Sequence, residues 1–446
     1  MRRTTSRQTV RMSTSTGMLT DRYELTMLAA ALRDGTAHTP CVFEVFARRL
    51  PEGRRYGVVA GTARVLEAIT SFGVDADELL WLNDNAVVDD TTAAFLRNYR
   101  FDGTVVGYPE GEVFFADSPI LTVHATFAQA VVLETVILSI LNHDAAVAAG
   151  ASRMVTAARD RPIIEMGSRR THEFAAVAAA RSAYLAGFAS TSNLAAGRTF
   201  AIPTAGTAAH AFTLLHGDEI SAFRSQVALY GAATTLLVDT YDITQGIANA
   251  VAAAGPELAA IRIDSGDLGV LAQQARAQLD ALGNPNTKIV VSGDLDEYAI
   301  AGLAAAPVDM YGAGTAVVVG SGAPTAGLIY KLVEVDGRPV AKRSERKTTN
   351  GGAKVARRAH RASGTATDEI VIAGPPERVV AELGNEYANL RALQQTLMHD
   401  GAITEAGTQT LADARERLRA TLRTLPWEGL SLSRGEPAVP TRVMTA

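Results

Sequence analysis

The sequence has 446 residues, of which 47% are hydrophobic and 20% charged, a composition typical of a globular protein with two or three domains. The formal net charge of −5 argues against a general nucleic-acid binder, which normally carries a basic face. A single cysteine, Cys41, excludes an intrachain disulfide and fits a reducing compartment, so we expect a cytoplasmic protein. The most apolar stretch, residues 130–141, is too short to span a membrane, so no membrane partner is expected.

The first 17 residues are polar and basic and lack the apolar segment of a secretory signal, so we expect a disordered tail over residues 1–17. Residues 18–133 combine helical patterns with short strands such as CVFEVFARRL, and turn signals at residues 51–53 and 109–111 separate them. This pattern predicts an N-terminal α+β domain.

Residues 134–326 alternate short apolar runs with alanine-rich helical stretches. The runs predict strands that begin near residues 162, 198, 234, 260, 288 and 308, with about one βα unit between them. Strands that are apolar on both faces indicate a parallel sheet, either open or closed into a barrel. Polar residues at the end of each run favour an α/β fold with an irregular (β/α) barrel, because these ends meet on one face of a barrel.

The residues after 326 return to strand patterns, LIYKLVEV and RPVAKRSERK, around a turn at Asp336 and Gly337. A Lys/Arg-rich segment follows, and residues 410–422 form an amphipathic helical pattern. Residues 327–446 are therefore expected to form a C-terminal region of strands with a helical tail.

Carboxylates follow three successive predicted strands, in the motifs VDTYD, RIDSGD and SGDLD. Carboxylates in this arrangement can bind Mg²⁺ with several waters retained, or accept hydrogen bonds from ribose hydroxyls. The alternative for each of them is helix N-capping, for which aspartate is favoured. Their repetition at three strand ends favours a functional site; the six residues are Asp239, Asp242, Asp264, Asp267, Asp294 and Asp296.

Glycine, histidine and arginine also follow the predicted strands. Gly293 and Gly314 allow backbone N–H groups to approach a phosphate, although a tight turn explains them equally well. His210, in IPTAGTAAH, can act as a nucleophile, as a base or as a buried structural residue. Arg169, which follows PIIEM, suits a carboxylate or a phosphate.

These motifs, taken together and in this order, resemble the nicotinate phosphoribosyltransferase family. The similarity runs from LTDRYELTM at residue 19 to the strands near residue 357, and includes FEVFARRLPEGRRYGVVAG, EMGSRRTH, FASTSN, PTAGTAAH, VDTYD, RIDSGD, VSGD, YGAGT and YKLVEV. It implies an irregular α/β barrel, an N-terminal domain completed by C-terminal strands, and a homodimer whose active sites are shared across the interface. One departure is Asn350, at a position where family members often have proline.

The resemblance also implies roles for individual residues. ATP phosphorylates His210, and Tyr23 of the other subunit stacks on the pyridine ring near Arg169. Asp239 is implied as a contact of Mg²⁺ and pyrophosphate. The other implied contacts are to the ribosyl group (Arg262 and Asp264), the ribose and its 5-phosphate (Gly293, Asp294, Gly314 and Thr315) and further phosphates (Arg49, Lys331, Lys342 and Lys347). In FASTSN, Ser192 or Thr191 is expected near the ring, where its hydroxyl can donate to the nicotinate carboxylate.

The implied activity is ATP-coupled transfer of a 5-phosphoribosyl group from phosphoribosyl pyrophosphate to nicotinate, which yields nicotinate mononucleotide for NAD biosynthesis. A nicotinamide phosphoribosyltransferase is the nearest alternative. Enzymes of that type carry an aspartate near the ring, whereas FASTSN offers hydroxyls that can donate to a carboxylate. His210 argues against quinolinate phosphoribosyltransferases, which lack the ATP step, and the complete set of site residues argues against a non-catalytic paralogue.

Overall fold

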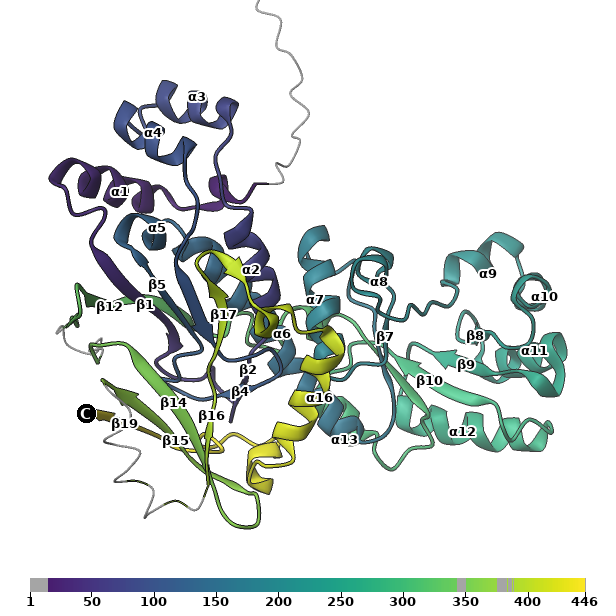
Figure 1. The fold of residues 1–446 in the computed structure, drawn as a ribbon. Coiled ribbons are helices and arrows are strands. Elements are labelled where there is room, and N and C mark those ends of the chain that lie inside the picture. Colours follow the sequence, from purple (N-terminus) through teal and green to yellow (C-terminus); the bar gives the residue numbers. More distant parts are fainter. Residues whose placement is uncertain (1–14, 343–349, 375–382, 384–386, 388, 446) are drawn as a thin grey trace, which may run out of the picture.

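The computed structural model describes residues 15–342, 350–374, 383, 387 and 389–445. The described residues form sheets of seven, six, four and two strands. Figure 1 shows the seven-stranded sheet on one side of the molecule and the six-stranded sheet, with its helices, on the other. The long helix α6 (Glu134–Ala158) lies between these two regions.

The seven-stranded sheet is antiparallel and has the order β13-β12-β1-β5-β3-β17-β18. Its central strands precede residue 134 and its outer strands follow residue 327, which confirms that C-terminal strands complete the N-terminal domain. Phe43 of β1 stacks on Tyr330 of β12 with ring centroids 4.8 Å apart, so the two segments share one core. The elements before α6 are α1 (Arg22–Asp34), β1 (Pro40–Ala47), β2 (Gly57–Val58), α2 (Thr62–Thr70), α3 (Ala76–Asp84), α4 (Asp90–Arg97), β3 (Thr104–Gly107), β4 (Val113–Phe114), β5 (Leu121–Thr126) and α5 (Phe127–Val131).

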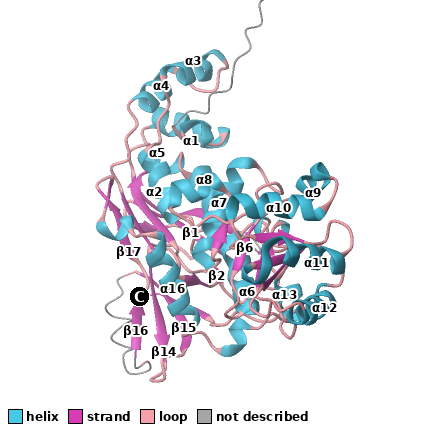
Figure 2. Ribbon diagram, turned by 90° about the vertical axis from the view of Figure 1, so that its right-hand side faces the viewer, coloured by secondary structure: helices cyan, strands magenta, loops and turns pink. Residues whose placement is uncertain are grey.

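The six-stranded sheet is parallel and has the order β7-β6-β11-β10-β9-β8, which confirms the α/β fold class. β7 and β8 are its edges, so the described strands form a half-barrel. Leu236, Ile261 and Ile289 are fully buried in the core of this region, and Figure 2 shows α11 and α12 on the outer side of the strands. The elements are β6 (Ile163–Glu165), α7 (Glu173–Ala186), β7 (Ser190–Thr191), α8 (Leu194–Phe200), α9 (His210–His216), α10 (Glu219–Tyr230), β8 (Thr235–Leu237), α11 (Ile243–Ala254), β9 (Ala260–Ile263), α12 (Leu268–Ala281), β10 (Lys288–Ser292), α13 (Glu297–Gly302), β11 (Met310–Ala313) and α14 (Thr315–Val318).

The C-terminal region adds a four-stranded sheet of order β16-β14-β15-β19 and helix α16, which packs against α7 of the barrel region. Arg415 of α16 donates hydrogen bonds to the carbonyl oxygens of Gly187 and Phe188 at 3.0 and 2.6 Å. These contacts join the C-terminal region to the parallel sheet. The elements are β12 (Leu328–Val335), β13 (Arg338–Pro339), β14 (Lys354–His360), β15 (Ala366–Ala373), β16 (Asn389–Ala392), β17 (Gln395–His399), β18 (Ala402–Ile403), α16 (Leu411–Leu422) and β19 (Thr441–Thr445).

Two expectations about local structure are corrected. The strand predicted near residue 198 is wrong, because Asn193 caps α8 by accepting the Ala196 N–H at 2.8 Å and residues 194–200 are helical. The disordered tail predicted for residues 1–17 is wrong at its end: the Thr16 hydroxyl donates to the Ala68 carbonyl at 2.7 Å, and Gly17 is buried. Residues 1–14 lie outside the described residues. In the described part of the chain, no helix is both long enough and apolar enough to cross a membrane.

Candidate active site

A cavity of about 500 Å³ lies at the carboxyl ends of the parallel strands. Its volume suits a small-molecule ligand of a few tens of atoms. Parallel strands bring their carboxyl ends to one edge, which is why residues far apart in sequence meet here. Nine predicted site residues line the cavity: Arg169, Ser192, His210, Arg262, Asp264, Gly293, Asp294, Gly314 and Thr315.

The two members of each aspartate pair occupy different positions. The second member caps the next helix by accepting its backbone N–H groups: Asp242 on α11, Asp267 on α12 and Asp296 on α13. Of the first members, Asp264 and Asp294 line the cavity, and Asp239 lies beside His210. The N-capping alternative is therefore correct for three of the six aspartates.

Arg262, on β9, ties three parts of the site together. Its guanidinium donates to Asp264 Oδ1 at 2.8 Å, to the Ser292 hydroxyl at 2.7 Å and to the Thr207 hydroxyl at 2.8 Å. Burial alone raises the pKa of Asp264, but hydrogen bonds from Ser292 and Arg262 outweigh it and hold that pKa below its usual value. Asp264 is therefore an ionised carboxylate at neutral pH, fixed at the cavity wall.

His210 is the first residue of α9, and its side chain is 41% exposed. Its Nδ1 lies 3.1 Å from the Thr240 hydroxyl, and its Nε2 lies 3.8 Å from Asp239 Oδ1. The other oxygen of Asp239 accepts the Asp264 N–H at 2.9 Å and the Ser265 hydroxyl at 2.7 Å. Oδ1 is buried and has no hydrogen-bond partner among the described residues, so it can interact with a cation or with a protonated His210.

The turn after β10 has an unusual backbone. Gly293 has a φ of 109°, and a Cβ atom there would lie 2.5 Å from the Asp264 carbonyl oxygen, so only glycine fits. The next residue, Asp294, has a φ of 44°, which is uncommon for a residue with a side chain. Strained conformations of this kind concentrate at ligand sites, where the surrounding structure maintains them.

Arg169 and Ser192, which follow the neighbouring strands β6 and β7, form one wall of the cavity, and both are exposed. Thr191 does not belong to this wall, which corrects the expectation that it contacts a ligand. It is fully buried: its hydroxyl donates to Glu165 at 2.5 Å and accepts the Asn193 N–H at 2.9 Å. Thr191 is the last residue of β7 and faces Glu165, whereas Ser192 follows the strand and lines the cavity.

Four predicted phosphate or ring contacts lie away from this cavity. Tyr23, on α1, is 44% exposed, and Figure 1 shows α1 and α9 on opposite sides of the molecule. Lys331 Nζ lies 3.6 Å from Glu134 at the start of α6. Arg49 and Lys342 are exposed and do not line the cavity. Lys347 lies outside the described residues.

Glu134 also faces Tyr23. Burial, the charge of Glu134 and a hydrogen bond to it raise the pKa of the Tyr23 hydroxyl. Tyr23 and Lys331 therefore share one carboxylate partner, at the start of α6. One chain thus carries two separate groups of predicted site residues.

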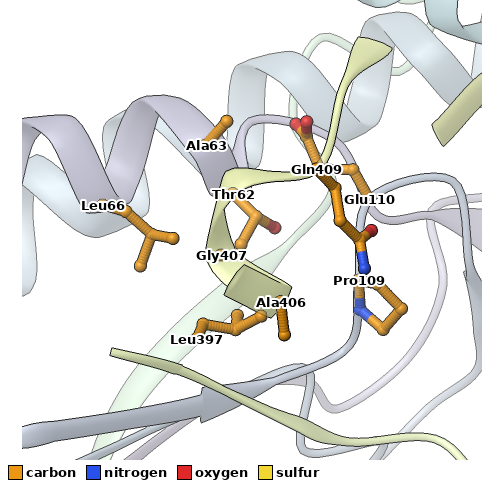
Figure 3. A pocket seen from close by; sticks show the side chains of 9 residues that line it. All are labelled: Thr62, Ala63, Leu66, Pro109, Glu110, Leu397, Ala406, Gly407 and Gln409. Atoms are coloured by element: carbon orange, nitrogen blue, oxygen red, sulfur yellow. The ribbon is translucent and has the colours of Figure 1, made fainter. Parts of the chain in front are cut away.

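Figure 3 shows a second hollow, between α2 and the 3-10 helix Glu405–Thr408. It includes Glu110, but its volume is about 10 Å³, which is room for one water molecule at most. A larger hollow of about 510 Å³ beside β14 contains none of the predicted site residues. The cavity at the ends of the parallel strands is therefore the candidate active site.

The family model for the N-terminal domain of nicotinate phosphoribosyltransferase matches residues 18–142. Nicotinate phosphoribosyltransferase pncB1 of Mycobacterium tuberculosis (strain ATCC 25618 / H37Rv) is 58% identical over 439 residues, which cover 96% of this chain and 96% of that protein. The chain belongs to the nicotinate phosphoribosyltransferase family. The Bacillus subtilis nicotinate phosphoribosyltransferase is 36% identical over 77% of this chain and 73% of its own length. The crystal structure of human nicotinic acid phosphoribosyltransferase has a TM-score of 0.79 and 26% identity, and the match covers 95% of this chain and 97% of that chain.

Several residues of the nicotinate phosphoribosyltransferase site were missed in the sequence. Ser292 and Thr207 bond to Arg262, Thr240 bonds to His210, and Ser168 lines the cavity. Each one is a direct neighbour, or lies within three residues, of a residue that was predicted. Small hydroxyl residues at strand ends are also common turn residues, so their type alone did not single them out.

Proposed function

We propose that the protein transfers a 5-phosphoribosyl group from phosphoribosyl pyrophosphate to nicotinate, giving nicotinate mononucleotide and pyrophosphate, in a cycle driven by ATP hydrolysis in the cytoplasm. The observation that carries the proposal is the convergence of the nine predicted residues on one cavity of suitable size. The names of the relatives, which are nicotinate phosphoribosyltransferases from two bacteria and human, support it.

The cavity offers what a ribosyl transfer needs. Departure of pyrophosphate leaves positive charge at the ribosyl carbon, and the ionised Asp264 is a fixed negative charge that can stabilise it or accept ribose hydroxyl bonds. The Gly293–Asp294 turn and the Gly314–Thr315 segment bring backbone close to the ligand, as a phosphate requires. Attack by the pyridine nitrogen involves little proton transfer, so positioning and charge stabilisation dominate.

Recognition of the base is assigned to Arg169 and Ser192, because a guanidinium and a hydroxyl can both donate to the nicotinate carboxylate. No aspartate side chain lines this wall of the cavity in the described residues. That composition favours nicotinate over nicotinamide, whose amide N–H groups need an acceptor.

The ATP step is assigned to His210, because its imidazole is accessible and adjoins the cavity. Asp239 Oδ1, 3.8 Å from Nε2, favours the tautomer with the proton on Nε2, which leaves the lone pair on Nδ1. Nδ1, with the Thr240 hydroxyl as donor, is then the nitrogen that attacks the γ-phosphate of ATP. Phosphorylation of His210 adds negative charge beside the substrate site. Substrates then bind the phosphorylated and the unphosphorylated protein with different free energies, and this difference couples ATP hydrolysis to substrate affinity.

Mg²⁺ belongs to the same proposal. The unpartnered Oδ1 of Asp239 is the available protein oxygen, and pyrophosphate oxygens and waters would complete the coordination. The ion would neutralise charge on the leaving pyrophosphate. Asp239 itself is held in place by the Asp264 N–H and the Ser265 hydroxyl.

A homodimer with shared active sites is also proposed. Tyr23 does not line the cavity of its own chain, and it is exposed together with Met27 on α1 and with Leu19 just before that helix. The barrel region exposes apolar residues on α9, which begins at His210, and on the adjoining α10, including Leu215 and Tyr230. Exposed large apolar side chains occur at subunit contacts, and a second copy can bring its Tyr23 to the cavity.

The test is product formation by the purified protein with phosphoribosyl pyrophosphate, Mg²⁺ and nicotinate, with and without ATP. We expect nicotinate mononucleotide and pyrophosphate in equal amounts, formed faster with ATP and together with ADP. Absence of the mononucleotide under both conditions would refute the proposal. Product without any effect of ATP would refute only the ATP coupling.

A further inference from the structure

Glu165, the last residue of β6, is a buried carboxylate directly beneath the candidate base-binding wall. It is fully inaccessible, and burial raises its pKa. Among the described residues, it takes part in no ion pair with lysine, arginine or histidine. A carboxylate buried without a cation is costly and is retained only when its oxygens have specific partners.

The partners of Glu165 lie on two different segments. One carboxylate oxygen accepts the Gly167 N–H at 2.5 Å, on the turn that carries Arg169. The other accepts the Thr191 hydroxyl at 2.5 Å, on the segment that carries Ser192. The backbone carbonyl of Glu165 also accepts the Ser192 N–H at 2.8 Å.

The two segments have little freedom to move apart. A Cβ atom on Gly167 would lie 2.2 Å from Val318 and 2.9 Å from the Gly314 carbonyl oxygen. The turn that carries Arg169 therefore packs tightly against α14. Above Glu165, the Asn193 side chain donates to the Ser168 hydroxyl at 3.0 Å and forms a second link between the segments. The Glu165 side chain and the Asn193–Ser168 hydrogen bond are therefore two separate side-chain links between the segments.

We propose that Glu165 is a positioning residue that fixes Arg169 and Ser192 relative to one another, and so sets the geometry in which the pyridine carboxylate is bound. The proposal rests on the proposed function. Glu165 does not line the cavity and touches no substrate; it acts through the Gly167 N–H and the Thr191 hydroxyl. When such support is lost, binding groups are displaced by about an ångström, which is enough to weaken the contact between Arg169 and the pyridine carboxylate.

This role requires a hydrogen bond to each of the two segments rather than a negative charge. In Glu165→Gln, the amide oxygen can accept the Gly167 N–H, and the amide NH₂ can donate to the Thr191 oxygen, so both segments stay linked. In Glu165→Ala, neither link exists. Thr191→Val removes one link and leaves Glu165 in place.

The experiment measures kcat and the KM values for nicotinate and for phosphoribosyl pyrophosphate in these three variants. We expect Glu165→Ala to raise KM for nicotinate by at least about tenfold, because small displacements of a binding group have large effects, while KM for phosphoribosyl pyrophosphate changes by less than about twofold. Glu165→Gln should stay within about threefold of the wild type. Thr191→Val should lie between the two, and Glu165→Ala/Thr191→Val should be no worse than Glu165→Ala, because the two residues act as one unit.

The matched control is Glu44→Gln. Glu44 is likewise a fully buried strand carboxylate whose pKa is raised by burial, but it pairs with Lys354 at 2.7 Å and lies outside the cavity. It should lower the melting temperature without a selective change in KM for nicotinate. The proposal would be overturned if Glu165→Ala changed KM for nicotinate and KM for phosphoribosyl pyrophosphate equally. It would also be overturned if Glu165→Gln were as impaired as Glu165→Ala.

Two further outcomes remain distinguishable. If Glu165→Ala does not fold, Thr191→Val still decides the matter by a selective rise in KM for nicotinate, while Glu165→Gln should stay close to the wild type. If the wild type uses nicotinamide and not nicotinate, the proposed function fails, and the positioning role is judged on KM for the base that is used. No selective effect on that base in any variant would then refute the positioning role separately.

Discussion

His210 is the residue on which the ATP-dependent part of the proposal depends. His210→Asn keeps a donor of similar size but cannot form a phosphoramidate, and the residue is 41% exposed, so the fold should persist. We expect incorporation of γ-labelled phosphate and ATP stimulation to be lost together, while slow ATP-independent transfer remains. Wild-type label should be acid-labile and base-stable.

The control is His216→Asn, at the other end of α9, where the ring bonds to the Phe212 carbonyl. That variant should retain both label and ATP stimulation. If His210→Asn is still labelled and still stimulated, the phosphate acceptor lies elsewhere.

Ser192 carries the choice of base. Ser192→Asp places a carboxylate beside the nicotinate carboxylate, and two like charges at close range repel. We expect kcat/KM for nicotinate to fall at least about a hundredfold, which corresponds to roughly 3 kcal/mol, while turnover of nicotinamide falls less or rises. Ser192→Ala measures the loss of the hydroxyl alone. A Ser192→Asp variant that uses nicotinate as well as Ser192→Ala does would show that the base binds elsewhere.

Residue types at strand ends predicted much of this cavity, because the topology of a parallel sheet turns sequence neighbours of strand ends into spatial neighbours. Arg262, Asp264 and Gly293 could be found in this way. The role of Glu165 could not be predicted in this way, because in the sequence it is one polar residue inside an apolar run. Nothing in that run shows that its oxygens accept hydrogen bonds from Gly167 and Thr191.

At the scale of elements, the turn after β6 controls the shape of the cavity. Gly167→Ala should force Val318 and the Gly314 backbone to shift, because its Cβ would lie 2.2 Å from the valine side chain. We expect a loss of unfolding free energy of about 1–3 kcal/mol, typical of overpacking, and a clear loss of nicotinate turnover. Chemical unfolding and steady-state kinetics measure the two effects.

Gly302→Ala, in α13, is the comparison, because a Cβ there meets no atom within 4 Å and alanine favours helix. It should leave stability unchanged or slightly raised and activity unchanged. If Gly167→Ala behaves like Gly302→Ala, the turn has room to adjust and does not constrain the cavity.

Five of the six strands predicted for the barrel correspond to described strands. A short run of β-branched residues without polar neighbours is typical of a strand that is buried on both faces of a sheet. The run near residue 198 failed for a specific reason. Thr199, Phe200 and Ile202 favour strand, but the Asn193 cap starts a helix just before them. Of this run, Thr204 alone pairs, in a single bridge to Thr191.

At the scale of the molecule, long-range ion pairs were beyond sequence reasoning. Arg54 is buried against Glu297 at 3.3 Å, although 243 residues separate them. Arg358 is fully buried between Glu112 and Glu369 at 2.7 and 2.5 Å. No local pattern reports such partners, and breaking one buried pair typically costs several kcal/mol.

Sharing of the active site is the prediction for the whole assembly. Tyr23→Ala removes the ring on the N-terminal domain, and Asp264→Ala removes the cavity carboxylate that bonds to Arg262, so each variant alone should be nearly inactive. Refolded or co-expressed mixtures contain dimers with one complete site, and random pairing should restore about a quarter of wild-type activity. Differently tagged chains confirm that mixed dimers form. Tagged mixed dimers without recovered activity would contradict a shared site.

The most direct measurement of the central claim is a competition between nicotinate and nicotinamide in one reaction. With both bases at equal concentration, phosphoribosyl pyrophosphate and ATP, the ratio of the two mononucleotides equals the ratio of the two kcat/KM values. The exposed Arg169 and Ser192 predict that nicotinate mononucleotide exceeds nicotinamide mononucleotide by at least about a hundredfold. Equal amounts, or an excess of nicotinamide mononucleotide, would contradict the assignment of this cavity to nicotinate.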